Sequence, residues 1–165
     1  VSTLAVIGQE RTFPSCDSPH LTARTDPMET FQFDDDDASM TFAIAEAQRT
    51  LPEFFKQFAS PRANQQYFLV KVHFESNGAS EHVWIANIDA AVFPLTGTIA
   101  NETSLPSLRF MDRASFHPGQ ISDWMIIEDG TMVGGYTNLG AIDRMSETER
   151  EQHLARLPYK VPGHF

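Results

Sequence analysis

Residues 121–136 read Ile-Ser-Asp-Trp-Met-Ile-Ile-Glu, then Asp-Gly, then Thr-Met-Val-Gly-Gly-Tyr, and this stretch decides the fold. Asp129-Gly130 between two apolar runs predicts a β-hairpin, because a type I′ turn needs positive φ at both central residues. The two-residue turn sets a register of Glu128 opposite Thr131, Ile126 opposite Val133, Trp124 opposite Gly135, and Asp123 opposite Tyr136.

Both faces of this hairpin carry apolar side chains. A strand pair that is apolar on both faces is buried on both, so we expect it in the middle of a sheet or inside a strongly curved one. Gly134-Gly135 predicts a bend or the close approach of another element. In the predicted register the indole of Trp124 covers the bare backbone at Gly135.

The chain has 165 residues with 12 basic and 22 acidic side chains, a net charge of −10. This acidity argues against nucleic acid and anionic membrane as partners, because both attract basic surfaces. Residues 1–37 carry 8 acidic and 2 basic residues and three prolines, which predicts an extended connector. Residues 38–165 are the length of a single domain.

Cys16 is the only cysteine, so an internal disulfide is excluded. We expect no insertion into a membrane, because no apolar run approaches the roughly 20 residues that a spanning helix needs. The first residue is Val1 rather than Met, which is compatible with a removed leader and equally with a fragment of a longer chain. A periplasmic or secreted location and a cytoplasmic one both stay open, as does the oligomeric state.

Two helices are predicted before the first long strand. The first helix, residues 38–49, follows a run of four aspartates. Its N-cap is predicted to be Asp37 or, alternatively, Ser39. The acidic run lacks the spaced ligands of a calcium loop, so we interpret it as a helix cap. Pro52 is expected to end this helix, and Thr50-Leu51-Pro52-Glu53 predicts a capping box that opens a second helix through about residue 59.

Residues 66–75 and 81–89 are predicted as strands joined at Asn77-Gly78. A two-residue turn places Val70 and Val72 on one face with Val83 and Ile85, a core face shared by Phe68 and Phe74. The other face carries Tyr67, Leu69, Lys71 and His73 opposite Ile88, Ala86, Trp84 and His82. Further strands are predicted at 95–99 and 107–110, and a capping box at Ser146–Glu149 predicts a helix to about residue 157.

These elements predict an α+β fold: a curved, mostly antiparallel sheet of five to seven strands, with the N-terminal helices packed on one face.

The candidate binding residues are Tyr67, Lys71, His73, His82, Trp84, Asp123 and Tyr136. We interpret the face that holds Tyr67, Leu69 and Trp84 as an interaction surface, because it is too apolar to be left in water. His73 opposite His82 invites a metal interpretation, but strand alternation sends Glu75 and Glu81 to the other face. We therefore expect neither a metal nor another cofactor.

The chain resembles the bacterial YegJ-like family of unknown function (DUF2314). The matching pieces are the entry helix leading to Leu51-Pro52-Glu53-Phe54, then Glu81-His82-Val83-Trp84, Ile121-Ser122-Asp123-Trp124-Met125 and Gly134-Gly135-Tyr136-Thr137. They span residues 38–137. The resemblance implies no activity and no catalytic residue. The chain also looks similar to small acidic bacterial immunity-type proteins that bind toxin partners.

Two function classes follow. The preferred one is a non-enzymatic binding module, immunity-like in the sense that it neutralises a protein partner. The alternative is a small hydrolase with a cleft around Asp123, Tyr136 and His82. No nucleophile elbow, phosphate loop, H-E-x-x-H or C-x-x-C motif is present, and a Ser122–His82–Asp123 triad is not expected, because Ser122 and Asp123 should point to opposite faces of one strand.

Overall fold

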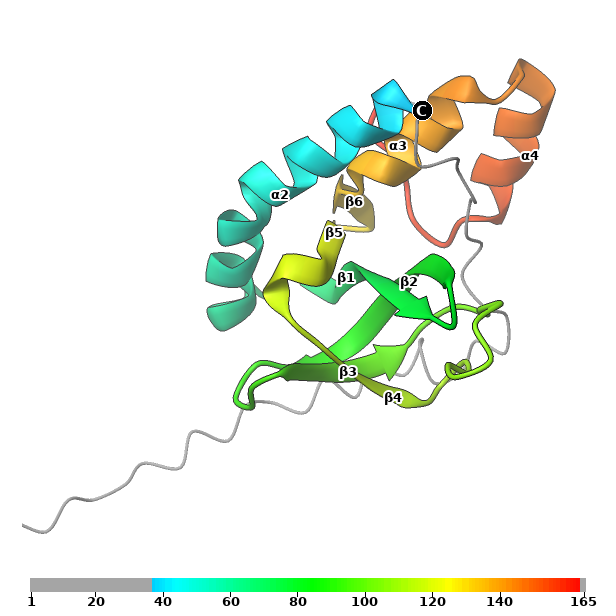
Figure 1. The fold of residues 1–165 in the computed structure, drawn as a ribbon. Helices are drawn as coiled ribbons and strands as arrows, with labels where there is room; N and C mark the ends of the chain where they lie inside the picture. The colour runs from blue at the N-terminus through cyan, green and yellow to red at the C-terminus, as the bar shows by residue number, and fades with distance from the viewer. Residues whose placement is uncertain (1–36, 164–165) are drawn as a thin grey trace, which may run out of the picture.

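A computed structural model describes residues 37–163 of the chain. The elements in chain order are α2 (Ala38–Ala59), β1 (Gln65–Ser76), β2 (Ala79–Asp89), β3 (Leu95–Ile99), β4 (Arg113–Phe116), η1 (Pro118–Gln120), β5 (Ile121–Glu128), β6 (Thr131–Gly134), α3 (Tyr136–Arg144) and α4 (Glu147–Arg156) (Figure 1). The predicted connector lies outside the described residues except for Asp37, and so does Cys16.

One six-stranded antiparallel sheet has the strand order β4-β3-β2-β1-β5-β6. The β1–β2 turn has φ of 52° at Asn77 and 81° at Gly78, as a type I′ turn requires. The register places His73 opposite His82 and Lys71 opposite Trp84, which confirms the predicted pairing. The fold is therefore the predicted α+β arrangement, with an open sheet rather than a closed barrel.

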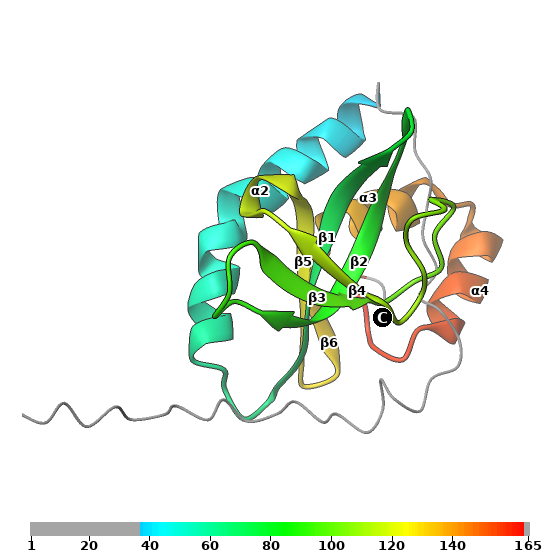
Figure 2. The same ribbon diagram turned by 60° about the horizontal axis from the view of Figure 1, so that its bottom comes forward.

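Two layers cover the sheet. Helix α2 lies on one side and α4 on the other (Figure 2). The first hydrophobic cluster lies under α2 and includes Val70, Val72, Val83 and Ile85, as predicted for that face. The second lies on the opposite side and includes Leu69, Trp84, Met125 and Met132, with Ile142 of α3. Because the sheet is covered on both faces, β5 is buried along nearly its whole length.

The β5–β6 turn also has positive φ at both central residues, Asp129 at 49° and Gly130 at 73°. The predicted register is confirmed from Glu128↔Thr131 to Met125↔Gly134, but it ends there. Gly135, at φ 68°, is instead the N-cap of α3, and Tyr136 is the first residue of that helix. Gly135 N–H still donates to the Trp124 carbonyl at 2.7 Å, so the predicted backbone pairing of these two residues is met, but the Trp124 ring lies against Gly134 rather than Gly135. The predicted cross-strand pair of Asp123 with Tyr136 is wrong, because consecutive positive-φ glycines turn the chain out of the sheet.

Helix α2 is one continuous helix of 22 residues that passes through Pro52, so the predicted break is wrong. Asp37 is its N-cap and accepts hydrogen bonds from the backbone N–H groups of Ser39 and Met40. The Thr50 hydroxyl does not open a new helix. It donates to the carbonyls of Glu46 and Ala47, at 2.8 and 3.2 Å.

Packing explains the continuity. Ala47 and Phe54, on either side of the proline, are both buried in the first cluster. A helix held on one apolar stripe tolerates the local loss of one hydrogen bond.

Three other predictions are corrected. The strand expected at 107–110 is instead β4, at residues 113–116. Helix α3 was not anticipated. Ile88 lies in the first cluster rather than the second, because Asn87, at φ 48°, interrupts the alternation along β2. The Ser146–Glu149 capping box is confirmed at the start of α4.

None of the described helices is long and apolar enough to cross a membrane.

Candidate functional site

A buried polar cluster joins β1, β5 and α3. Lys71 and Asp123 are directly opposed across these two strands. Lys71 Nζ donates to Thr137 Oγ1 at 3.0 Å, and Thr137 Oγ1 donates to Asp123 Oδ2 at 2.6 Å. The three residues are 3%, 0% and 3% exposed, respectively. The cluster is therefore closed to substrates of any size in this conformation.

Asp123 holds the N-terminus of α3 against the sheet. Its carboxylate accepts hydrogen bonds from the backbone N–H groups of Tyr136 (3.2 Å) and Thr137 (2.8 Å), the first two residues of that helix. Gly135 at the N-cap has no side chain that could do this. A carboxylate is also favoured by the positive end of the helix dipole. Asp123 thus supplies the capping group from a neighbouring strand.

Burial controls the ionisation of this cluster. It lowers the pKa of Lys71 to about 8, although the nearby Asp123 carboxylate acts in the opposite direction. Burial also raises the pKa of Asp123, while hydrogen bonds from Thr137 and the charge of Lys71 oppose the rise. Lys71 Nζ lies 5.2 Å from the centroid of the Trp84 ring, which is a cation–π contact between the two residues that the register places opposite each other.

A second polar group lies beside the first. Ser122 is the extra residue of a β-bulge, because β1 pairs Lys71 with Asp123 and Val72 with Ile121. Ser122 and Asp123 therefore do not alternate as expected: Ser122 Oγ lies 2.7 Å from His82 Nδ1 and donates to the Lys71 carbonyl at 3.2 Å. The ring of His82 stacks on His73, with centroids 4.6 Å apart.

These contacts give no support to a cleft around Asp123, Tyr136 and His82. Asp123 is fully buried, and its contact with Tyr136 is to the backbone N–H rather than to the phenol. The Tyr136 ring packs on Trp124 in an edge-to-face contact. A groove in the described part of the molecule is lined by Gly130, Leu154 and residues 157–161, and it does not reach these groups.

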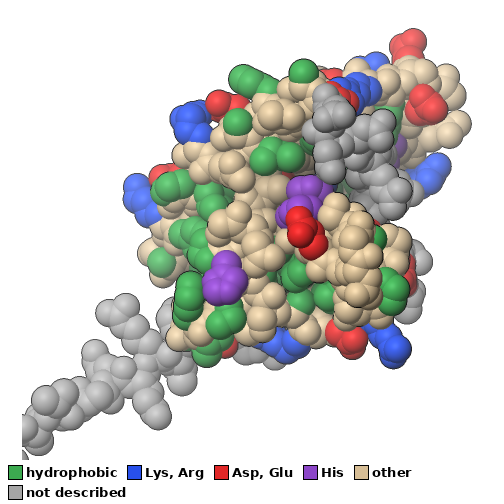
Figure 3. All heavy atoms as spheres, in the orientation of Figure 1, with side chains coloured by type: hydrophobic (Ala, Val, Ile, Leu, Met, Phe, Trp, Pro, Cys, Tyr) green, Lys and Arg blue, Asp and Glu red, His purple; other side chains and the backbone are tan. Residues whose placement is uncertain are grey.

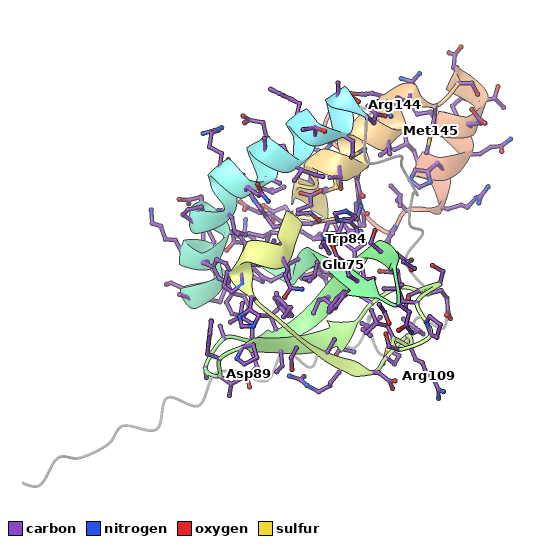
Figure 4. The ribbon with its side chains drawn as sticks, viewed as in Figure 1. Glu75, Trp84, Asp89, Arg109, Arg144 and Met145 are labelled. Atoms are coloured by element: carbon purple, nitrogen blue, oxygen red, sulfur yellow. The ribbon has the colours of Figure 1, made fainter. Side chains whose placement is uncertain are left out.

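The face that was expected to be an interaction surface is interior. Trp84 is 0% and Leu69 2% exposed, because α3 and the C-terminal residues pack over them. Figure 4 shows Trp84 in the middle of the molecule. Tyr67 packs against the same cluster and is partly exposed, as are His73 and His82 at the other end of the face. The prediction of an open surface on this face is wrong, because α3, α4 and the C-terminal residues cover most of it. The alternation of residues along the strands does not reveal this cover.

Among residues 37–163 no group of three or more histidine, cysteine, aspartate or glutamate side chains could hold a metal ion. His73 is instead close to Glu75, with 3.8 Å between Nδ1 and Oε1.

Sequence reasoning missed two features. Thr137 links Lys71 to Asp123 in the buried cluster, and Gly134-Gly135, which predicted a bend, was the available signal for the element that carries it. The other feature is the β2–β3 loop, residues 90–94, read as Ala-Ala-Val-Phe-Pro, in which every residue is exposed and none is charged. Its apolar composition was visible in the sequence, but its exposure was not.

Comparison with known proteins gives the following. The family model described as "Uncharacterized protein conserved in bacteria (DUF2314)" matches residues 37–159. A "Putative ankyrin repeat protein" of Neisseria meningitidis serogroup B is 27% identical over 72% of this chain and 51% of its own length. The "Uncharacterized protein YegJ" of Escherichia coli K12 is 25% identical over 62% of this chain and 66% of its own length.

The chain thus spans less than two thirds of either curated relative. No solved structure matches it. The resemblance inferred from the sequence motifs is confirmed.

Proposed function

This chain belongs to the DUF2314 family of uncharacterized proteins conserved in bacteria, and we propose that it is a non-enzymatic module that binds a protein partner. The observation that carries the proposal is the exposed apolar loop, which we define as residues 90–94. Phe93 is 76% and Val92 45% exposed, although each is large and apolar. We propose that Phe93 is the anchor that enters a pocket of the partner.

The apolar loop does not stand alone on the surface. The Phe93 ring lies edge-to-face with His117, their centroids 5.2 Å apart, and His117, Pro118 and Gly119 are exposed too. Asp89 marks the position of this turn at the margin of the molecule (Figure 4). On that side, hydrophobic side chains gather around a histidine at the lower left of Figure 3.

Physical chemistry favours a binding role for such a surface. Aromatic anchors that are exposed in the free protein contribute much of the affinity of protein interfaces. A contiguous apolar patch left in water is unfavourable for a monomer and is typical of interaction sites. A net charge of −10 over the chain makes a basic partner surface the complementary one.

The name of one relative is consistent with a role in protein binding. One of them is named as an ankyrin repeat protein, and this chain matches about half of it. Ankyrin repeats form extended concave surfaces that bind other proteins. We propose that the domain matched here also serves recognition, with immunity-like neutralisation of a protein partner as one form of it.

The test is site-specific photo-cross-linking in the bacterium that makes the protein. Phe93 is replaced by a photoreactive phenylalanine analogue, and the cross-linked product is identified by mass spectrometry. Phe42 on α2 is the matched control, since it is an equally large aromatic residue with 68% exposure on another surface. We expect one defined product from position 93 that position 42 does not give.

The identified protein is then purified and its affinity measured by calorimetry. Phe93→Ser should weaken binding about 30-fold or more, as truncation of an anchor does, while Phe42→Ser should leave it unchanged. Both substitutions fall on exposed side chains, so the fold is retained. Equal affinity of the wild-type and Phe93→Ser proteins would reject the apolar loop as the docking surface.

A further inference from the structure

A groove of about 510 Å³ opens between the β5–β6 turn and the C-terminal arm, which we define as residues 154–161. The arm begins in the last turn of α4 and runs back towards β6 (Figure 2). Leu154, Leu157 and Val161 supply apolar walls, and Tyr159 and Lys160 also line the groove. This volume lies in the range of small-molecule sites.

Backbone hydrogen bonds hold the groove in shape. Lys160 N–H donates to the Gly130 carbonyl at 2.8 Å, and Met132 N–H donates to the Lys160 carbonyl at 2.9 Å. These bonds form a parallel bridge between Lys160 and Thr131 at the edge of the sheet. A ligand would therefore enter a site that needs little ordering of the protein, which lowers the cost of binding.

The floor of the groove is continuous with the second hydrophobic cluster. Val161 is 2% exposed and belongs to that cluster, and Leu154, Leu157 and Tyr159 pack against it. These three are only partly buried, so part of their apolar surface faces the groove. An alkyl or aryl group of a ligand would remove this surface from water.

The charge of the groove comes from one residue. Among the residues that the structure describes, Lys160 is the only charged one that lines it, and its side chain is exposed. Within the described residues no carboxylate forms an ion pair with Lys160, in contrast to Lys56, which pairs with Glu53. Its backbone is committed to the bridge, while its exposed side chain is not.

We propose that this groove binds a small amphiphile that has an alkyl or aryl body and a carboxylate head, with the carboxylate paired to Lys160. The apolar walls select the body, and a single ammonium group selects a single negative charge. The site is separate from the apolar loop of residues 90–94, so it stands or falls independently of the proposed protein-binding function.

The test uses 11-bromoundecanoate and 11-bromoundecanol, which share the same chain and differ in the charge of the head. Bromine quenches tryptophan fluorescence at short range, and Trp84 lies in the cluster beneath the groove. We expect saturable quenching by the acid with one site per chain, and at least threefold weaker binding of the alcohol. Lys160→Gln should weaken the affinity of the protein for the acid about three- to fivefold and leave its affinity for the alcohol unchanged.

Lys56→Gln is the matched control, because it removes an exposed lysine from α2 without touching the groove. Phe93→Ser should also leave binding of the acid unchanged. Since residue 160 bridges the sheet through its backbone, its side-chain variant keeps the groove intact. Absence of saturable quenching, equal affinity for acid and alcohol, or loss of binding in Phe93→Ser would each overturn the proposal.

Discussion

Gly134 has the tightest surroundings in the central hairpin. A Cβ atom there would lie 2.5 Å from the Trp124 carbonyl oxygen and 2.7 Å from two atoms of its ring, at a φ of 77°. Gly134→Ala should lower the free energy of unfolding by about 2–4 kcal/mol, because overpacking adds to the backbone penalty. Urea denaturation measures this, and a loss below about 0.5 kcal/mol would contradict the geometry.

The same hairpin gives a test of contact. At Gly135 a Cβ would instead meet the Met132 sulfur, at 2.6 Å. In double-mutant cycles Trp124→Ala should therefore couple to Gly134→Ala by about 0.5 kcal/mol or more, and Trp124→Ala should be close to additive with Gly135→Ala. Coupling that favours Gly135 would instead place the indole over Gly135, as expected from the sequence, and reject its observed position against Gly134.

Lys71 makes stability depend on alkaline pH. Burial lowers its pKa in the folded protein from 10.5 to about 8. Between these values the unfolded chain binds more protons than the folded one, so the free energy of unfolding rises with pH, by about 2–3 kcal/mol over the whole window. Urea melts from pH 7.5 to 10.5 measure the rise, and Lys71→Met should remove it. An identical slope in the variant would show that other groups cause the effect.

At the scale of residues, the sequence predicted which residues face each other across strands, but not how deeply each residue is buried. The His73–His82 and Lys71–Trp84 contacts followed from one Asn-Gly turn, because a two-residue turn leaves a single register. The role of Asp123 could not be predicted, since it depends on a helix that starts thirteen residues later in the chain, at Tyr136. Likewise, the bulge at Ser122 arises from pairing with β1 and has no local signal.

At the scale of elements, Pro52 is the clearest conflict between local preference and packing. Pro52 lacks the N–H that would bond to Gln48, yet Ala47 and Phe54 remain buried in one cluster. The Trp124 indole N–H also donates to the Ala47 carbonyl at 3.1 Å, close to the position of the proline. The tertiary contacts of α2 thus outweigh the helix-breaking effect of Pro52. Sequence patterns alone do not reveal these contacts.

Pro52→Ala should therefore stabilise the protein by about 1–2 kcal/mol, less than the roughly 3 kcal/mol of intrinsic preference, because the helix is already formed. Pro52 is exposed, so the change creates no cavity. Thermal unfolding followed by circular dichroism measures the gain. A destabilised variant would instead show that the proline is needed to direct α2 around the sheet.

At the scale of the whole molecule, the sheet has two cores with different origins. The first is made by α2, which the sequence predicted to pack on one face. The second is made by α3, α4 and the C-terminal arm, and its polar neighbour is the Lys71–Asp123–Thr137 cluster. The sequence showed apolar residues on this face but not the helices and C-terminal residues that pack over them. For this reason the strand pattern predicts a surface position for Trp84, which is buried.

The C-terminal arm should thus contribute to stability out of proportion to its length. Val161 is 2% exposed and packs in the second cluster, one residue after the backbone bridge to the edge strand. Val161→Ala should lower the free energy of unfolding by about 1–2 kcal/mol through lost burial and a small cavity.

Val92→Ala, at a residue 45% exposed in the apolar loop, removes the same atoms and should cost less than about 0.5 kcal/mol. Urea denaturation of the two variants compares the same chemical change at a covered and an uncovered site. Equal losses would mean that the arm does not close the second core, and the face beneath it would again be open to a partner.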